Sequence, residues 1–282
     1  MAVRVVTDST SDLSRDLAAS LGITIVPLKV LWGDETFRDG IDITEDTFYT
    51  RLSGAKVMPT TSQPSPGEFE STFRDLAKSG DDLCVITISS KLSGTYSSAV
   101  TAKSAVEGEI TVEVVDSLQV SMALGLVVMR AAKAAQAGAS LVECVRIANE
   151  TAAKTEILFL VDTLEFLKRG GRIGQASALL GSLLNIKPML AVRNGEVVPA
   201  ERTRTRQKGL ERLFEWVTGH PTVGAIGVLA SPPLEDPNAV ANRLAKQYPS
   251  TPLFRGVLGP VVGVHTGPGV VGCAIYTGDQ FD

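Results

Sequence analysis

Residues 3–21 read VRVVTDSTSDLSRDLAASL, a β-branched run followed by a helical pattern. The apolar β-formers over 3–7 predict a strand. Apolar positions then recur at the four-residue spacing of one helix face, at Leu13, Leu17 and Leu21. Ser11 or Asp12 stands where a side-chain N-cap is expected. A strand that leads through a short polar turn into a helix is the repeating unit of an α/β fold.

The same alternation continues through the first half of the chain. Further strands are expected over 23–32, 83–89 and 111–116. Between and after them, helices are expected over 44–52, 66–78, 94–106 and 120–137. Strands that alternate with helices predict a mainly parallel sheet with helices on its faces.

After about residue 155 the pattern changes. Two apolar runs, 186–192 and 196–200, flank Asn194-Gly195, which is a strong hairpin signal. A helix is expected over 204–217, and strands are expected over 223–230, 253–258 and 270–276. This half therefore predicts a mixed or antiparallel sheet backed by helices. With 282 residues the chain is long enough for two domains, which we place at 1–155 and 156–282.

The composition is that of a globular protein with a sizeable core. Apolar residues make up 44% of the chain and charged residues 21%. No secretory signal is visible, and no apolar run reaches the roughly 18 residues that span a bilayer. The three cysteines are isolated within apolar stretches, which favours reduced thiols over disulfides or metal ligands; they are Cys84, Cys144 and Cys273. We therefore expect a cytoplasmic protein without a metal, a cofactor or a stable membrane insertion.

Charge is distributed unevenly along the chain. The net charge is -4, which disfavours nucleic-acid binding. Residues 168–212 nevertheless contain ten Lys or Arg and three Glu, a local charge of 10 - 3 = +7 that leaves -11 for the rest. Such a segment predicts a docking surface for an acidic partner.

Small hydroxyl clusters follow three of the predicted strands. They are DSTS at 8–11, SSKLSGT at 89–95 and DS at 116–117. The carboxyl ends of parallel strands form the edge of a sheet at which ligands bind, so these loops can line one site. The alternative is that these residues only cap the helices that follow them.

Two of the polar loops have further properties that suit an anion. Ser93-Gly94 precedes a predicted helix, whose first amides and positive dipole end favour a negative group. The segment PTTSQPSP at 59–66 holds three prolines and predicts a stiff, extended loop that presents Thr61 or Ser62.

Other candidate residues lie in the second half. The run KRGGRIG at 168–174 lacks the glycine spacing of a phosphate loop, and Arg169 can instead offer a planar fork to a carboxylate. His265, within VHTGPG at 264–269, is predicted in a tight turn, where it is either functional or a hydrogen-bonded core residue; His220 is predicted at the surface. Neither a Gly-x-Ser-x-Gly nor a His-Glu-x-x-His motif occurs, so nothing here requires catalysis.

Taken in order, these motifs resemble the DegV family along essentially the whole chain. The matching segments are DSTSDL at 8–13, PTTSQPSP at 59–66, SSKLSGTY at 89–96, DS at 116–117, FLKRGGRI at 166–173, KP at 187–188, RTRTR at 202–206 and HTGPG at 265–269. One departure is Ala123, where the family often has glycine. A methyl group there bears on the preferred chain length of a ligand.

The resemblance implies a two-domain α/β DegV-like fold, in which the segment about 59–72 packs on the second domain. It further implies a long-chain fatty-acid carrier that is not itself an enzyme but the binding subunit of a bacterial fatty acid kinase. A separate ATP-dependent kinase subunit then forms the acyl phosphate that enters phospholipid synthesis. Residue by residue, it places Thr61, Ser93 and His265 around the carboxylate with Arg169 nearby, and it places Arg172 and Arg202 where the kinase docks.

Two other hypotheses remain open at this stage. One is a phosphotransfer component that uses His265 as phosphoryl acceptor, because the family's first domain is similar to folds of sugar phosphotransferase and dihydroxyacetone kinase components. The other is a nucleic-acid or regulatory module that uses the +7 segment. Binding that falls steeply with salt would indicate the latter.

Overall fold

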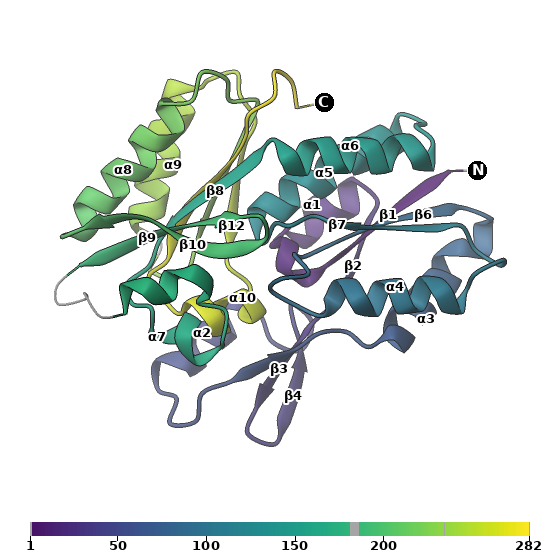
Figure 1. Ribbon diagram of the computed structural model, residues 1–282, viewed down its shortest axis with the longest axis horizontal. Coiled ribbons are helices and arrows are strands. Elements are labelled where there is room, and N and C mark those ends of the chain that lie inside the picture. The colour runs from purple at the N-terminus through teal and green to yellow at the C-terminus, as the bar shows by residue number, and fades with distance from the viewer. Residues whose placement is uncertain (1, 181–185, 234, 282) are drawn as a thin grey trace.

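The described residues form three β-sheets (Figure 1). The computed structural model describes residues 2–180, 186–233 and 235–281. One sheet belongs to the first half and a second to the other half. The third is small and lies beside both.

The first sheet is parallel, as predicted. Its order is β2-β1-β6-β7, from β1 (Val3–Asp8), β2 (Ile23–Val26), β6 (Asp82–Thr87) and β7 (Val112–Asp116). On one face α3 (Pro66–Leu76) and α4 (Thr95–Ala105) bury their apolar stripes, and on the other lie α5 (Met122–Gln136) and α6 (Leu141–Ala153). Short helices η1 (Ser9–Ser11) and α1 (Arg15–Ser20) follow β1.

The predicted strand over 23–32 is in fact two strands in two sheets, which corrects the sequence prediction. β2 ends at Val26, and β3 (Lys29–Trp32) joins the small sheet with order β4-β3-β5. Pro27 stands between them, and proline has no N–H to extend the ladder. The small sheet also contains β4 (Glu35–Arg38) and β5 (Thr60–Ser62), so the expected loop at 59–66 begins as a strand.

The large sheet is mixed, as predicted, with order β10-β9-β8-β13-β11-β12. Its strands are β8 (Thr155–Leu160), β9 (Lys187–Arg193), β10 (Glu196–Thr203), β11 (Ala225–Ala230), β12 (Leu253–Val257) and β13 (Val271–Tyr276). Asn194 and Gly195 both have positive φ in the predicted β9–β10 hairpin. Helices α8 (Arg206–Thr218) and α9 (Glu235–Gln247) pack on this sheet, whereas α7 (Glu165–Arg169) and η3 (Gly174–Leu179) precede β9.

Two local predictions need correction. The first helix starts at Arg15, with the Ser14 hydroxyl accepting from Leu17 N, so neither Ser11 nor Asp12 caps it. His265 does not lie in a loop between apolar runs. It lies near the C-terminal end of a short helix, α10 (Pro260–Thr266). Helices α6, α7, α9 and α10 and strands β4 and β8 had no counterpart among the predicted elements.

Helix α10 crosses back to the first half of the chain. Val261 and Val264 pack with Phe48 and Tyr49 of α2 (Glu45–Ser53) and with Val30 of the small sheet. The segment about 59–72 is divided, since β5 contacts α10 while Phe69 and Phe73 of α3 pack on the first sheet.

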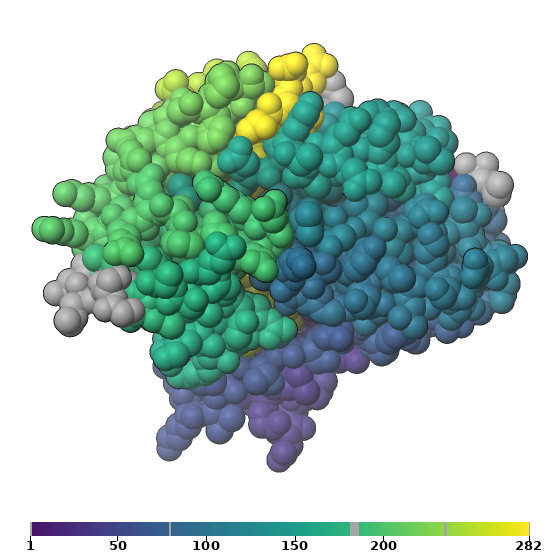
Figure 2. All heavy atoms as spheres, viewed as in Figure 1, coloured from purple at the N-terminus to yellow at the C-terminus, as the bar shows by residue number. Residues whose placement is uncertain are grey.

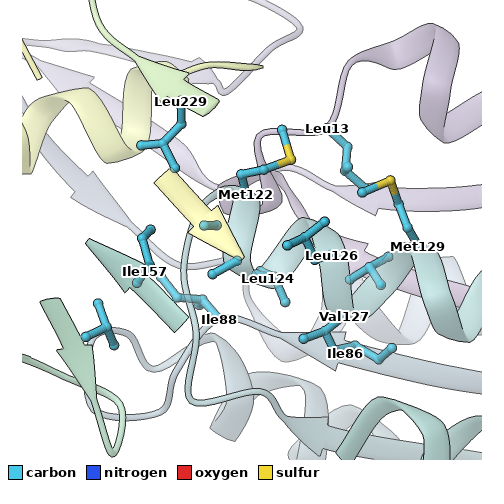
Figure 3. Close-up of a cluster of buried hydrophobic side chains, with 14 of the residues drawn as sticks. Leu13, Ile86, Ile88, Met122, Leu124, Leu126, Val127, Met129, Ile157 and Leu229 are labelled. Carbon is cyan, nitrogen blue, oxygen red and sulfur yellow. The ribbon is translucent and has the colours of Figure 1, made fainter. Parts of the chain in front are cut away.

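The main core lies between the two large sheets, around α5. Figure 3 shows Leu124 of α5 in one cluster with Ile88, which follows β6, and Ile157 of β8. On the face shown in Figure 2 the two halves of the chain meet along one seam. Among the described helices, none is long and apolar enough to cross a bilayer.

Candidate functional site

A cavity of about 80 Å³ lies where the two halves and α10 meet. Its apolar lining comes from both halves, namely Leu28, Ile88, Leu92, Val120, Phe159, Leu167, Val192, Val197, Val261 and Val262. Its polar lining consists of Thr10, Thr61, Gln63, Ser93, Arg172, His265 and Thr266. Three of the four predicted carboxylate-binding residues therefore line one cavity.

Thr61 and His265 are in direct contact. Thr61 Oγ1 on β5 lies 2.8 Å from His265 Nε2 on α10, although 204 residues separate them in sequence. Burial and the positive charge of Arg172 lower the pKa of His265 to about 4. The imidazole is therefore neutral at pH 7, and its Nδ1 is buried without a hydrogen-bond partner.

Ser93 stands at the start of α4. Its Oγ lies 2.8 Å from Thr95 Oγ1 and accepts a 3.3 Å hydrogen bond from Thr95 N. The N-cap residue Gly94 offers no side chain to the first amides of this helix. A Cβ on Gly94 would lie 2.6 Å from Gln63 Nε2, so the glycine lets the Gln63 amide approach. Ser93 and Gln63 thus both line the cavity next to the start of α4.

Arg169 and Arg172, which the sequence analysis placed near the carboxylate and at the docking surface, make different contacts. Arg172 lines the cavity and donates to Leu92 O at 3.1 Å and to Gly170 O at 2.7 Å. Arg169 is not among the lining residues, and its Nη2 lies 3.1 Å from Glu165 Oε1. The structure thus brings Arg172, rather than Arg169, to Thr61, Ser93 and His265.

The basic segment is partly neutralised by neighbouring acids. Arg206 pairs with Asp162 and Asp236, and Arg212 pairs with Glu201 and Glu215. Arg202, on the edge strand β10, is exposed and has no ion pair within the described residues. It remains available to a partner.

Sequence reasoning missed a second polar cluster, at the other end of α10. Asp12 Oδ1 accepts from Gly259 N at 3.0 Å, and Asp12 Oδ2 accepts from the Ser121 hydroxyl. Asp39 Oδ2 accepts from Ser9 Oγ at 2.8 Å. Burial raises the pKa of Asp39 to about 7 and raises that of Asp12 well above its ordinary value. We call Asp12 and Asp39 the acid pair.

Gln63 could have been predicted from the sequence, whereas the contact made by Asp12 could not. Gln63 lies two positions after Thr61, so an extended chain presents both side chains on one face. Asp12 belongs to the first polar turn, but nothing near it in sequence indicates its partner at 259. In the described ranges, no group of His, Cys, Asp and Glu side chains is arranged to hold a metal ion.

Comparisons with known proteins agree with the motif order. A family model described as an uncharacterised protein of the DegV family matches residues 2–278. A DegV domain-containing protein of Streptomyces coelicolor is 40% identical over 279 residues, which covers 97% of this chain and 98% of that one. The protein DegV of Bacillus subtilis is 35% identical over 276 residues, covering 96% and 98%.

Solved structures are similar over the same length. A structure from Thermus thermophilus, described as fatty acid binding of a DegV family protein, matches with a TM-score of 0.90 and 36% identity, covering 98% of this chain and 100% of that one. DegV of Bacillus subtilis, described as a fatty acid binding protein, matches with a TM-score of 0.90 and 34% identity, covering 98% and 99%.

Proposed function

The chain belongs to the DegV family, and from that premise we propose that it binds one long-chain fatty acid in the cavity between its two halves. The observation that carries the proposal is the polarity of this cavity. Thr61 contacts His265, the charge of Arg172 acts on His265, and Arg172 donates to the carbonyl of Leu92, next to Ser93. Ten of the remaining lining residues are apolar. A fatty acid has the same division between carboxylate and alkyl chain.

The polar end can replace the water that a carboxylate loses on entry. An anion in a low-dielectric site is costly unless donors and a positive charge surround it. Thr61 and Ser93 supply hydroxyls, and Gln63 supplies a side-chain amide. We assign the counter-charge to Arg172, because Arg169 faces Glu165.

The cavity is too small for a long alkyl chain, so it must widen when the ligand enters. A cavity of about 80 Å³ holds only a few water molecules, so apolar side chains move apart as a long chain enters. Burial of a methylene group is worth about 0.8 kcal/mol, and about fifteen of them supply roughly 12 kcal/mol of gross driving force. This free energy is sufficient to transfer a lipid from water or a membrane into a cavity that fits it.

In this proposal the protein is a cytoplasmic carrier and does not catalyse a reaction itself. A partner ATP-dependent kinase subunit phosphorylates the carboxylate, and the acyl phosphate feeds phospholipid synthesis. Exposed Arg202 belongs to the docking surface, and Arg172 at the cavity connects that surface to the ligand. Shielding by the surrounding residues slows hydrolysis of the acyl phosphate.

The alternative, phosphoryl transfer through His265, has less support. The Nε2 atom is engaged by Thr61 and the Nδ1 atom is buried, so neither nitrogen is free to attack a phosphoryl donor. Phosphohistidine on the isolated chain after incubation with phosphodonors would favour this alternative.

Mass spectrometry of lipid extracted from the gently purified protein tests fatty-acid binding. We expect one equivalent of a long-chain fatty acid, and we expect delipidated protein to take up labelled oleate or palmitate. Protein that is empty as isolated and takes up neither acid contradicts the proposal.

The kinase role needs a separate assay. With a fatty acid kinase subunit, ATP and hydroxylamine, the loaded carrier should yield acyl hydroxamate, and neither protein alone should. Arg202→Ala should reduce that yield while leaving oleate affinity unchanged. A normal yield from the variant would remove Arg202 from the docking surface.

A further inference from the structure

Helices α7 and α10 pack against each other through two glycines. Gly170 is the C-cap of α7, and a Cβ built on it would lie 2.1 Å from His265 Nδ1. Gly267 follows α10 with φ +75°, and its Cβ would lie 2.4 Å from the Phe166 ring. No real side chain approaches this closely, so only glycine at 170 lets the backbone lie against the imidazole.

This contact leaves Nδ1 without a partner. The atom is buried and has no hydrogen-bond partner in the described part of the chain. The neighbouring carbonyl, Gly170 O, already accepts from Arg172 Nη1. A neutral imidazole carries one proton, and a buried N–H without an acceptor is rarer in proteins than a buried acceptor that lacks a donor.

The other nitrogen has a suitable partner for the proton. His265 Nε2 can donate to Thr61 Oγ1 across 2.8 Å. The Thr61 hydroxyl then accepts from the ring and keeps its own proton for the cavity. A hydroxyl that accepts one hydrogen bond becomes a better donor in the next.

We propose that Gly170 is a positioning residue: it holds His265 in the Nε2–H tautomer, so that the Thr61 hydroxyl donates its proton to the ligand carboxylate. The inference rests on the proposed fatty-acid function. His265 acts through Thr61 in this arrangement, whereas Ser93 and Arg172 face the ligand directly.

The chain holds an internal reference for the tautomer. His220 is the other histidine, and its Nδ1 lies 2.7 Å from Trp216 O, a carbonyl that can only accept. In long-range ¹H–¹⁵N spectra at pH 7, His220 should therefore show the Nδ1–H form and His265 the Nε2–H form. His220→Gln assigns the signals. An Nδ1–H signal from His265 overturns the proposal.

Two side-chain amides separate the roles of the ring nitrogens. The amide of Gln reaches the place of Nε2, and that of Asn reaches only the place of Nδ1. We expect His265→Gln to keep oleate affinity within about threefold of wild type and His265→Asn to lose at least tenfold. Equal affinity in the two variants contradicts the proposal.

Gly170→Ala tests the positioning role itself. It should weaken oleate binding at least tenfold and shift or broaden the His265 nitrogen signals. Gly67→Ala is the matched control, because a Cβ at Gly67 meets nothing within 4 Å. If Gly170→Ala binds oleate as wild type does, the proposal is wrong. If Gly170→Ala does not fold, the tautomer of His265 in the wild type and the affinities of His265→Gln and His265→Asn test the proposal. Wild-type protein that binds no oleate refutes the proposed function instead.

Discussion

Both ends of α10 carry polar groups that are buried or half-buried, but these groups have different surroundings. At its start, Asp12 accepts from Gly259 N, and Asp39 of the same pair accepts from Ser9. At its last turn, His265 contacts Thr61 and lines the cavity. Burial favours the neutral form of each group. It therefore raises the pKa of the two acids and lowers the pKa of the histidine.

The difference lies in what the polar groups of each end contact. Asp12 accepts from the N-cap amide of Gly259 and from the Ser121 hydroxyl, so it fixes the start of the helix, although Oδ1 of Asp39 has no hydrogen-bond partner among the described residues. The other end keeps the hydroxyls of Thr61 and Ser93 and the guanidinium of Arg172 on a cavity wall. We therefore expect changes at the acid pair to alter stability and changes at the cavity end to alter ligand affinity.

Removal of Asp12 should have the largest effect. Asp12→Ala leaves Gly259 N and the buried Ser121 hydroxyl without their acceptor, so the free energy of unfolding should fall by about 3 kcal/mol. Urea denaturation measures this loss. A variant as stable as wild type would show that the acid pair does not anchor α10.

Thr61→Val should produce the reverse pattern. Valine keeps the shape but removes the hydroxyl, so oleate affinity should fall by about 2 kcal/mol, the usual value of a hydrogen bond to a charged group. The free energy of unfolding should change by less than about 1 kcal/mol. Displacement of a fluorescent fatty acid measures the affinity, and an unchanged Kd would exclude Thr61 from the site.

The acid pair should also make stability depend on pH. The pKa of Asp39 is raised from 3.8 to about 7, so between these values the folded state binds more protons than the unfolded state. The contribution of Asp39 to the free energy of unfolding must then fall as pH rises, by at most about 1.4 kcal/mol per pH unit. Asp39→Asn should flatten this slope in urea titrations at pH 5, 6 and 7. An unaltered slope contradicts the assignment.

The smallest effect is expected at Arg169. Its partner Glu165 is exposed, and such pairs contribute little. Arg169→Ala should change oleate affinity by less than about 0.5 kcal/mol, whereas Arg172→Ala should lower it by about 2 kcal/mol. Isothermal titration of both variants compares them directly. The opposite ranking would restore Arg169 to the carboxylate, as the family resemblance implies.

Much of the fold could be predicted because its signals are local. The strands of the first sheet, the long helices and the Asn194-Gly195 hairpin all follow from periodicity and turn chemistry over short windows. The division of 23–32 is different, since it depends on β3 pairing with β5, some thirty residues further along the chain. Helix α10 was missed because seven residues with an internal glycine give almost no helical period.

The motif order named Thr61, Ser93 and His265, and all three line one cavity. Their role at a carboxylate stays a prediction. The choice between Arg169 and Arg172 depends on where α7 ends, because Arg169 lies on the helix and Arg172 beyond it. Boundaries of this kind are set by packing, here of Gly170 on His265, which no local pattern reveals.

The position of α10 also bears on how the molecule unfolds. The helix belongs to the second half by sequence, but it completes the core formed by Phe48, Tyr49 and the small sheet. A fragment that ends at residue 155 would expose these aromatic rings to water. The two halves should therefore melt as one cooperative unit, and separately expressed halves should be soluble only when they are combined.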